Sequence, residues 1–258
     1  IAGSDSGGGA GIQADLRTFS FHQVHGTSAL TCVTAQNTTG VTRVDPLPPE
    51  AVIAQIEAVT GDIGVQAAKT GMLLNQPIIE AVASYLAAHP IERLVVDPVM
   101  VSRTGAQLID EGAIAALATQ LLPLAAILTP TRYEAQMLAD MDIATLADMK
   151  TAAQKIQALG PKTVIVKGGG FTGELQGVDV WCDGEQLVVL KTAQVDTLNT
   201  HGTGCTLSSA IAANLAKDMS PLVAVEAAKD YVTKALHHSL SIGKGQGPVG
   251  HFYPLLSS

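Results

Sequence analysis

Aromatic and charged residues are scarce in this sequence of 258 residues: aromatic side chains make up 3% and charged side chains 15%. A typical globular chain has roughly 25% charged residues. So few rings cannot supply a stacking platform for single-stranded nucleic acid. A net charge of −8 also leaves no excess of cations for phosphates or an anionic membrane surface. We therefore expect neither nucleic acid nor a membrane as partner, and a bound anion needs backbone amides and a few placed cations.

Cysteine is also rare. The three cysteines, Cys32, Cys182 and Cys205, form no disulfide framework and have no zinc-site spacing, which favours a reducing compartment such as the cytoplasm. Apolar runs stay below the ~20 residues that span a bilayer. The chain opens at Ile1 without Met, in what reads as the end of a strand. A hydrophobic content of 47% excludes intrinsic disorder and allows a sizeable core.

Strand-like and helix-like segments alternate over the whole chain. The strand-like segments are Thr27–Ala35, Ala67–Met72, Leu94–Val96, Ala125–Thr129, Thr163–Lys167 and the hairpin Val178–Cys182 with Leu187–Leu190. The helical segments are Gly11–His22, Pro49–Val59, Pro77–Ala88, Glu111–Leu122, 131–140, 145–159, 203–217 and 221–240. This order predicts one α/β domain over 1–258, with a mostly parallel sheet, helices on both faces and one antiparallel edge.

Ligands of such folds bind at the carboxyl ends of the strands, so the residues that follow the strands deserve most weight. The first such segment is glycine-rich and covers residues 3–11 before a predicted helix. Glycines let backbone approach a ligand, and a helix N-terminus favours negative charge. The segment is not a dinucleotide fingerprint, because Ile12 replaces the third glycine, and no phosphate-binding P-loop pattern occurs. A simple tight turn explains it equally well.

The second segment is Asn199–Cys205, which precedes an apolar helix. The amides of Gly202, Thr203 and Gly204 can converge on one point and form an anion hole for a phosphoryl group. Cys205 is expected in the first helical turn, where a thiol pKa is lowered and the sulfur can accept a proton from an attacking alcohol. A capped helix with a small buried cysteine is the alternative.

Charged residues follow other strands. Lys167, before three glycines, is placed to meet a nucleotide phosphate, and Asp97 ends a buried strand where a carboxylate suits Mg²⁺ or another cation. Glu134 belongs to the same class. A strand-capping lysine and surface turn acids are the competing interpretations. Together, the segments indicate a site for a phosphorylated nucleotide and a small molecule.

These segments resemble the hydroxymethylpyrimidine/phosphomethylpyrimidine kinases of thiamine biosynthesis, a family of the ribokinase-like superfamily. The resemblance rests on 2–15, 35–38, 69–72, 96–100, 166–169 and 199–205, and extends to 247–252. The Gly-Thr-Gly-Cys step is specific, since other ribokinase-like kinases usually have aspartate where Cys205 stands. The resemblance implies a ribokinase-like three-layer α/β/α fold and, by analogy with relatives, a homodimer.

The family chemistry implied is two-step. ATP, with Mg²⁺, phosphorylates 4-amino-5-hydroxymethyl-2-methylpyrimidine to the monophosphate, and a second ATP converts that to the diphosphate. By matched position Gln36 would bind the aminopyrimidine edge, which suits a carboxamide. Four further residues would line the substrate pocket: Gly3, Asp15, Met72 and Val99. The resemblance makes Cys205 the base, and it assigns Asp97 and Glu134 to Mg²⁺ and phosphates and Lys167 to the nucleotide.

The sequence departs from the family at two positions. Thr131 replaces the usual asparagine of Thr-Pro-Asn-x-x-Glu, which affects a link to Mg²⁺ and phosphate, and Arg103 replaces a common lysine, which changes the geometry of the charge. Two other functions stay open: a pyridoxal or pyridoxine kinase, and a non-catalytic pyrimidine-binding or regulatory protein. Gln36 and Cys205 favour the pyrimidine kinase over the first, and Cys205 with Asp97 argues against the second.

Overall fold

The computed structural model describes residues 1–101 and 109–256. Within these ranges a large sheet has six strands in the order β3-β4-β5-β6-β7-β8, and β1 and β2 form a separate two-stranded sheet. Strands β3 to β6 pair in parallel, whereas β7 and β8 join the edge antiparallel. This confirms the predicted α/β class, the mostly parallel sheet and its antiparallel edge hairpin.

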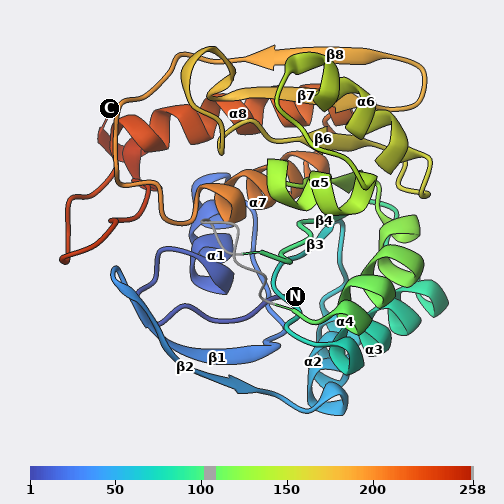
Figure 1. The fold of residues 1–258 in the computed structure, drawn as a ribbon. Coiled ribbons are helices and arrows are strands. Elements are labelled where there is room, and N and C mark those ends of the chain that lie inside the picture. Colours follow the sequence, from blue (N-terminus) through green and yellow to red (C-terminus); the bar gives the residue numbers. More distant parts are fainter. Residues whose placement is uncertain (102–108, 257–258) are drawn as a thin grey trace.

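The elements follow the predicted order along the chain (Figure 1). The strands are β1 (Cys32–Asn37), β2 (Gly40–Pro46), β3 (Ala68–Thr70), β4 (Leu94–Val96), β5 (Ile127–Leu128), β6 (Val164–Val166), β7 (Val178–Cys182) and β8 (Leu187–Lys191). The α-helices are α1 (Gly11–Phe21), α2 (Pro49–Asp62), α3 (Gln76–Ala88), α4 (Glu111–Ala116), α5 (Arg132–Ala139), α6 (Leu146–Gln157), α7 (Thr203–Ala216) and α8 (Pro221–His237).

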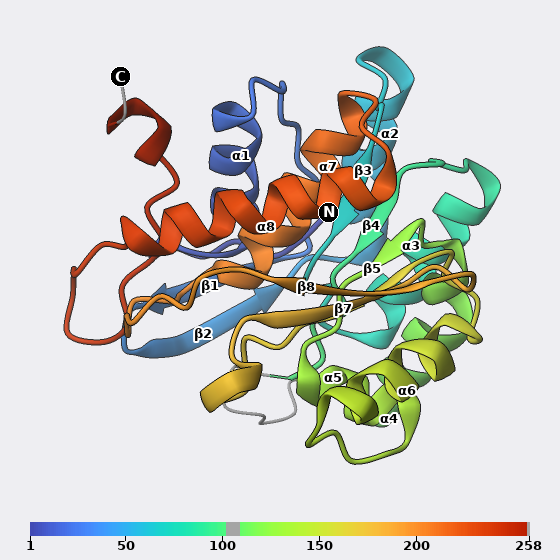
Figure 2. The same cartoon turned by 90° about the horizontal axis from the view of Figure 1, so that it is seen from above.

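Side chains of the central strands alternate between two apolar cores, one on each face of the sheet. Val96, Leu128 and Val166 belong to the core formed with α2 to α6. Their neighbours Val95, Ile127 and Ile165 belong to the core formed with α7 and α8. Figure 2 shows α8 and α6 on opposite sides of β7 and β8. Strands buried on both faces read as continuous apolar runs, which is why the sequence reveals them.

Two predictions on local structure were wrong. The predicted helix Glu111–Leu122 is regular only to Ala116, because Pro123 follows closely and the chain passes through a π-helical turn and a 3₁₀ turn. Strand β2 was not predicted at all. It is exposed along its whole length, so it lacks the apolar alternation that marks a half-buried strand. The β1–β2 hairpin stands apart from the large sheet (Figure 1).

The strand ends meet as predicted at one edge of the large sheet, since Asp97, Thr129 and Lys167 directly follow β4, β5 and β6. In the part of the chain described, helices long and apolar enough to cross a membrane are absent. Arg103, one of the two departures from the family pattern, lies outside the described residues.

Candidate active site

A buried ion pair lies where the parallel strands end. The Nζ atom of Lys167 lies 2.9 Å from Oδ1 of Asp97, and the Thr129 hydroxyl donates to the same oxygen at 3.1 Å. Burial alone would raise the pKa of Asp97, but the cations of Lys167 and Lys69 bring it below the usual value. Two predicted site residues, 70 positions apart in the chain, thus form one charged centre.

Helix α7 begins directly over this centre. A Cβ added to Gly204 would lie 3.4 Å from Lys167 Nζ and 3.8 Å from Asp97 Oδ2. One turn further on, the Ser208 hydroxyl donates to Asp97 Oδ2 at 3.4 Å. The first amides of a helix have no partner within the helix, so this turn offers donors beside a buried cation. An anion here would meet both.

Gly202, the N-cap of α7, has a φ of 81°, a conformation that favours glycine. A Cβ at this position would also lie 1.7 Å from the carbonyl oxygen of Gly9, so the two glycine-rich segments are packed backbone against backbone. Of the three predicted anion-hole residues, Thr203 already donates its amide to the Thr200 carbonyl at 3.3 Å. The amides of Gly202 and Gly204 are therefore the more available donors.

Cys205 is the third residue of α7 and is partly exposed, whereas Cys32 and Cys182 are buried. Its sulfur accepts a hydrogen bond from the Gly11 amide, which places it between the starts of α7 and α1. The predicted low thiol pKa is wrong for this structure. Burial raises the pKa of Cys205, and the charge of Lys69 opposes that rise only in part.

Lys69 belongs to a second buried ion pair beside the Cys205 sulfur. Its Nζ atom lies 2.9 and 3.1 Å from the two carboxylate oxygens of Asp15, and Ser209 donates to Asp15 Oδ1 at 2.6 Å. Burial lowers the pKa of Lys69, but Asp15 and Cys205 outweigh this and raise it above the usual value. Asp15, predicted to line the substrate pocket, thus has both oxygens engaged within the protein.

Asp5 organises the first glycine-rich segment. Its carboxylate accepts the amides of Gly7, Gly9 and Ala10 at 2.8, 3.1 and 2.8 Å, and His201 Nε2 lies 2.7 Å from Oδ2. Burial raises the pKa of Asp5, but these hydrogen bonds, led by that of His201, bring it below the usual value. The pair joins the segment before α1 to the segment before α7.

The predicted pyrimidine-binding residues come from separate segments: Gly3 precedes α1, Gln36 lies near the end of β1, and Met72 and Val99 follow β3 and β4. Gly3 sits between two sulfur-bearing side chains, since an added Cβ would lie 2.6 Å from Cys32 Sγ and 3.0 Å from Met72 Cε. The Oε1 atom of Gln36 accepts the Thr34 hydroxyl at 3.2 Å, and its side-chain NH₂ group donates no hydrogen bond to another described residue. Gln36, Met72 and Val99 are all partly exposed.

Glu134 is held by backbone amides. It forms a capping box with Thr131 at the start of α5, accepting the Thr131 amide at 2.7 Å, and its other oxygen accepts the Met100 amide at 3.3 Å. Thr131 thus supplies the N-cap. Burial raises the pKa of Glu134 to about 7, against the opposing charge of Lys167.

A metal would have few side-chain ligands here. The described residues contain no cluster of three or more His, Cys, Asp or Glu with metal-binding geometry. This fits Mg²⁺ bound with a nucleotide, which takes one or two carboxylates and completes its shell with phosphates and water. Among the described residues, Ser208 alone donates to Asp97 Oδ2, and at the long distance of 3.4 Å, so this oxygen is well placed to accept a cation.

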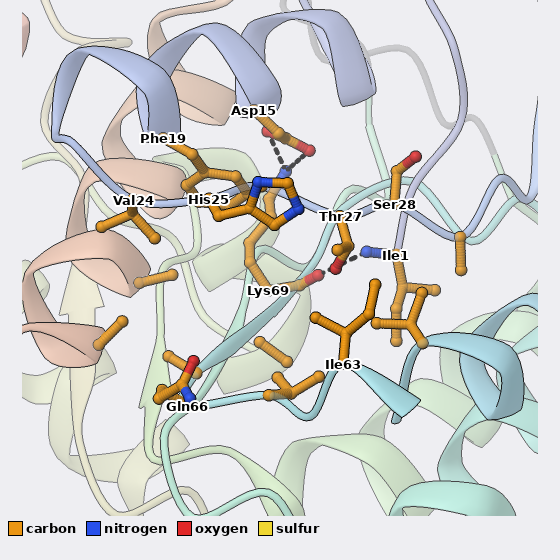
Figure 3. A pocket seen from close by; sticks show the side chains of 18 of the residues that line it. Ile1, Asp15, Phe19, Val24, His25, Thr27, Ser28, Ile63, Gln66 and Lys69 are labelled. Atoms are coloured by element: carbon orange, nitrogen blue, oxygen red, sulfur yellow. Dashed lines mark hydrogen bonds and ion pairs between the residues drawn. The ribbon is translucent and has the colours of Figure 1, made fainter. Parts of the chain in front are cut away.

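A pocket beside Ile1 adjoins this site through Asp15 and Lys69 (Figure 3). Asp15 is the single predicted site residue that lines it, and Lys69 reaches from β3 to Asp15 along its wall. Neither Cys205 nor Asp97 lines the pocket. The functional residues that sequence reasoning missed, Lys69 and His201, stood inside the Lys-Thr-Gly-Met and Asn-Thr-His-Gly segments, but only their partners reveal a role.

Comparisons with known proteins identify the family of this chain. The family model described as phosphomethylpyrimidine kinase matches residues 5–250. A hydroxymethylpyrimidine/phosphomethylpyrimidine kinase of Synechococcus elongatus is 64% identical over 255 residues, covering 99% of this chain and 97% of that protein.

Two solved structures share the whole fold. The phosphomethylpyrimidine kinase of Clostridium difficile superposes with a TM-score of 0.81 at 41% identity, covering 91% of this chain and 96% of the other. The pyridoxal kinase of Bacillus subtilis, solved as an ADP complex, gives 0.90 at 41% identity, covering 99% and 97%. On the sequence match over nearly its full length, the chain belongs to the phosphomethylpyrimidine kinase family.

Proposed function

We propose that the protein phosphorylates 4-amino-5-hydroxymethyl-2-methylpyrimidine with ATP and then phosphorylates the monophosphate to the diphosphate, as thiamine biosynthesis requires. The observation that carries this proposal is the start of α7, where open backbone amides and the Cys205 sulfur lie over the buried Asp97–Lys167 pair. Family membership supports the same assignment.

In the proposed reaction the hydroxymethyl oxygen attacks the γ-phosphorus of ATP. Its proton passes to Cys205 in the ionised form, which is a minor form because burial raises the pKa of this thiol, and ADP leaves with the electrons of the broken P–O bond. The amides of Gly202 and Gly204 stabilise the charge that develops on the phosphoryl oxygens, and the Thr203 amide joins them once it leaves the Thr200 carbonyl. Lys167 binds phosphate. Mg²⁺ would neutralise phosphate charge when bound, and the carboxylates of Asp97 and Glu134 would hold it.

The direct test is to incubate the protein with the pyrimidine alcohol, ATP and Mg²⁺ and to separate the products by mass spectrometry. We expect the monophosphate first and the diphosphate later. Folded protein that binds both substrates and forms no phosphorylated pyrimidine would rule the proposal out. It would favour a non-catalytic pyrimidine-binding protein, especially if no ADP appears.

Pyridoxal kinase is the second candidate, favoured by the TM-score of 0.90 to the pyridoxal kinase of Bacillus subtilis. The two functions are separated by measuring kcat/KM for pyridoxal and for the pyrimidine alcohol in the same preparation. We expect the pyrimidine to be preferred. Replacing Gln36 by Leu should then weaken pyrimidine binding more than pyridoxal binding, because it removes the group proposed to read the aminopyrimidine edge.

We also propose that the protein acts as a homodimer in the cytoplasm. Strand β2 is exposed along its length, and three exposed valines, Val33, Val41 and Val44, lie on the β1–β2 hairpin. An isolated two-stranded sheet is only marginally stable, so a second copy would support it. Light scattering after size-exclusion chromatography tests this, and Val41→Lys should favour the monomer.

The proposed location in the cytoplasm rests on the cysteines. The three unpaired cysteines support a reducing compartment.

A further inference from the structure

A third buried ion pair lies outside the chemistry proposed above. Lys229 of α8 and Asp179 of β7 meet at 2.5 Å between Nζ and Oδ2, with 8% of each side chain exposed. Lys229 Nζ also donates to the Gly177 carbonyl at 2.7 Å. The second oxygen of Asp179 accepts the Gly168 amide at 2.8 Å. The pair therefore satisfies backbone groups at residues 168 and 177.

These two glycines are the ends of one loop, residues 168–177, which directly follows Lys167. Within the loop, the amides of Phe171 and Gly177 donate to the Gly168 carbonyl at 3.0 and 3.4 Å. Gly168 is so close to the next strand that an added Cβ would lie 1.9 Å from the Val178 carbonyl oxygen. The base of the 168–177 loop is thus closed and tightly packed.

The two glycines that directly follow Gly168 in this loop, which we call the glycine tip, are exposed and loosely packed, unlike the base. Gly169 and Gly170 are exposed, and a Cβ added to either would have no atom within 4 Å. Phe171, which follows, is buried and lies 4.8 Å from the Arg132 guanidinium, so the far side of the tip is anchored as well. The tip therefore presents open backbone beside Lys167, on a base that cannot move freely.

Burying two charges is costly, and a well-packed hydrophobic pair would often stabilise a fold equally well. A hydrophobic pair would, however, leave the Gly168 amide and the Gly177 carbonyl without partners. The charges at residues 179 and 229 therefore specify the position of the loop ends in addition to contributing packing.

We propose that Lys229 and Asp179 are positioning residues for the nucleotide: they fix the 168–177 loop so that its glycine tip receives the phosphorylated nucleotide beside Lys167. This inference rests on the proposed use of ATP. It assigns no contact between the pair and the nucleotide. The effect is transmitted through the backbone of Gly168 and Gly177.

The test compares Lys229→Met with Lys234→Met, which removes an exposed lysine of the same helix paired with Asp230 on the surface. Calorimetry measures binding of ADP and, separately, of the pyrimidine alcohol. We expect Lys229→Met to weaken ADP binding about tenfold and to raise KM for ATP similarly, while pyrimidine binding and its KM stay within about twofold. Lys234→Met should leave all four quantities unchanged.

A second variant separates an effect on ADP binding from a general loss of stability. The double variant Asp179→Leu with Lys229→Met removes the unpaired buried charge and should recover part of the thermal midpoint that Lys229→Met loses, without recovering ADP affinity. Equal loss of ADP and pyrimidine affinity in Lys229→Met, or full recovery of ADP affinity in the double variant, would show a purely structural role. Wild-type protein that binds no ADP would overturn the proposed function itself; normal ADP binding by Lys229→Met would overturn this inference alone.

Discussion

Ser209 donates a 2.6 Å hydrogen bond to Asp15, and this contact ties the second turn of α7 to α1. Ser209 is one helical turn beyond Cys205, so it lies on the same side of α7. The neighbouring Ser208 makes the corresponding contact with Asp97. Two adjacent serines thus hold the N-terminal half of α7 against two carboxylates, each of which is paired with a buried lysine.

The first prediction concerns the charge next to Cys205. Lys69→Met removes the cation that lowers the pKa of this thiol and leaves Asp15 without its ion-pair partner, so the pKa should rise further. We expect the alkylation of Cys205 by iodoacetamide at pH 8 to become about tenfold slower. Peptide mass spectrometry measures the rate. Lys69→Arg should retain most of the rate. An unchanged alkylation rate in Lys69→Met would refute the electrostatic role.

The second prediction concerns Cys205 itself. Cys205→Ala removes the proposed proton acceptor but leaves the pocket open, so kcat should fall by about 10²- to 10⁴-fold. Pyrimidine affinity, measured by calorimetry, should stay within about twofold. Cys182→Ala, which changes a buried cysteine of the core, serves as control and should retain turnover. Wild-type turnover in Cys205→Ala would show that another group accepts the proton.

The third prediction concerns stability in acid. Burial, assisted by Arg17, lowers the pKa of His251 to about 4, from 6.5 in the unfolded chain. Its contribution to the free energy of unfolding is thus complete above pH 6.5 and is lost as the pH falls through about 4, by about 3 kcal/mol in total. In His251→Gln, the free energy of unfolding measured by urea denaturation should therefore fall less than in the wild type as the pH is lowered from 7 to 4.

The neighbours of His251 sharpen this test. Its Nε2 atom lies 2.9 Å from the Thr206 hydroxyl, and the Tyr231 hydroxyl donates to its carbonyl. The exposed His237→Gln is the matched control and should leave the pH profile as in the wild type. A His251→Gln profile as steep as that of the wild type would mean that other groups cause the acid sensitivity.

The fourth prediction concerns Gly3. Gly3→Ala places a Cβ 2.6 Å from Cys32 Sγ and 3.0 Å from Met72 Cε, so buried neighbours must shift. We expect a loss of about 1–3 kcal/mol in the free energy of unfolding and weaker pyrimidine binding. Gly61→Ala in α2, where the added Cβ meets nothing within 4 Å, should instead stabilise by about 0.5–1 kcal/mol. Denaturant unfolding of both variants provides the measurement, and a Gly3→Ala protein with normal stability and affinity would contradict the packing described.

Local pattern alone located the strands that end at Asp97 and Lys167, because strands buried on both faces are unbroken apolar runs. It also located the starts of α1 and α7, since glycine segments before apolar helices are local features. The sequence could not reveal β2, which has no apolar face, nor the hydrogen bond that Glu134 accepts from the Met100 amide, 34 residues away in the chain.

The sequence by itself determined the order of elements and which residue types stand at the carboxyl ends of the strands. Only the tertiary structure decided how they are paired: Lys167 with Asp97, Lys69 with Asp15, and His201 with Asp5. It also decided that the Cys205 thiol has a raised pKa. The physical reason is that burial and Coulomb interactions depend on side chains brought together from distant segments, which no local pattern of residues encodes.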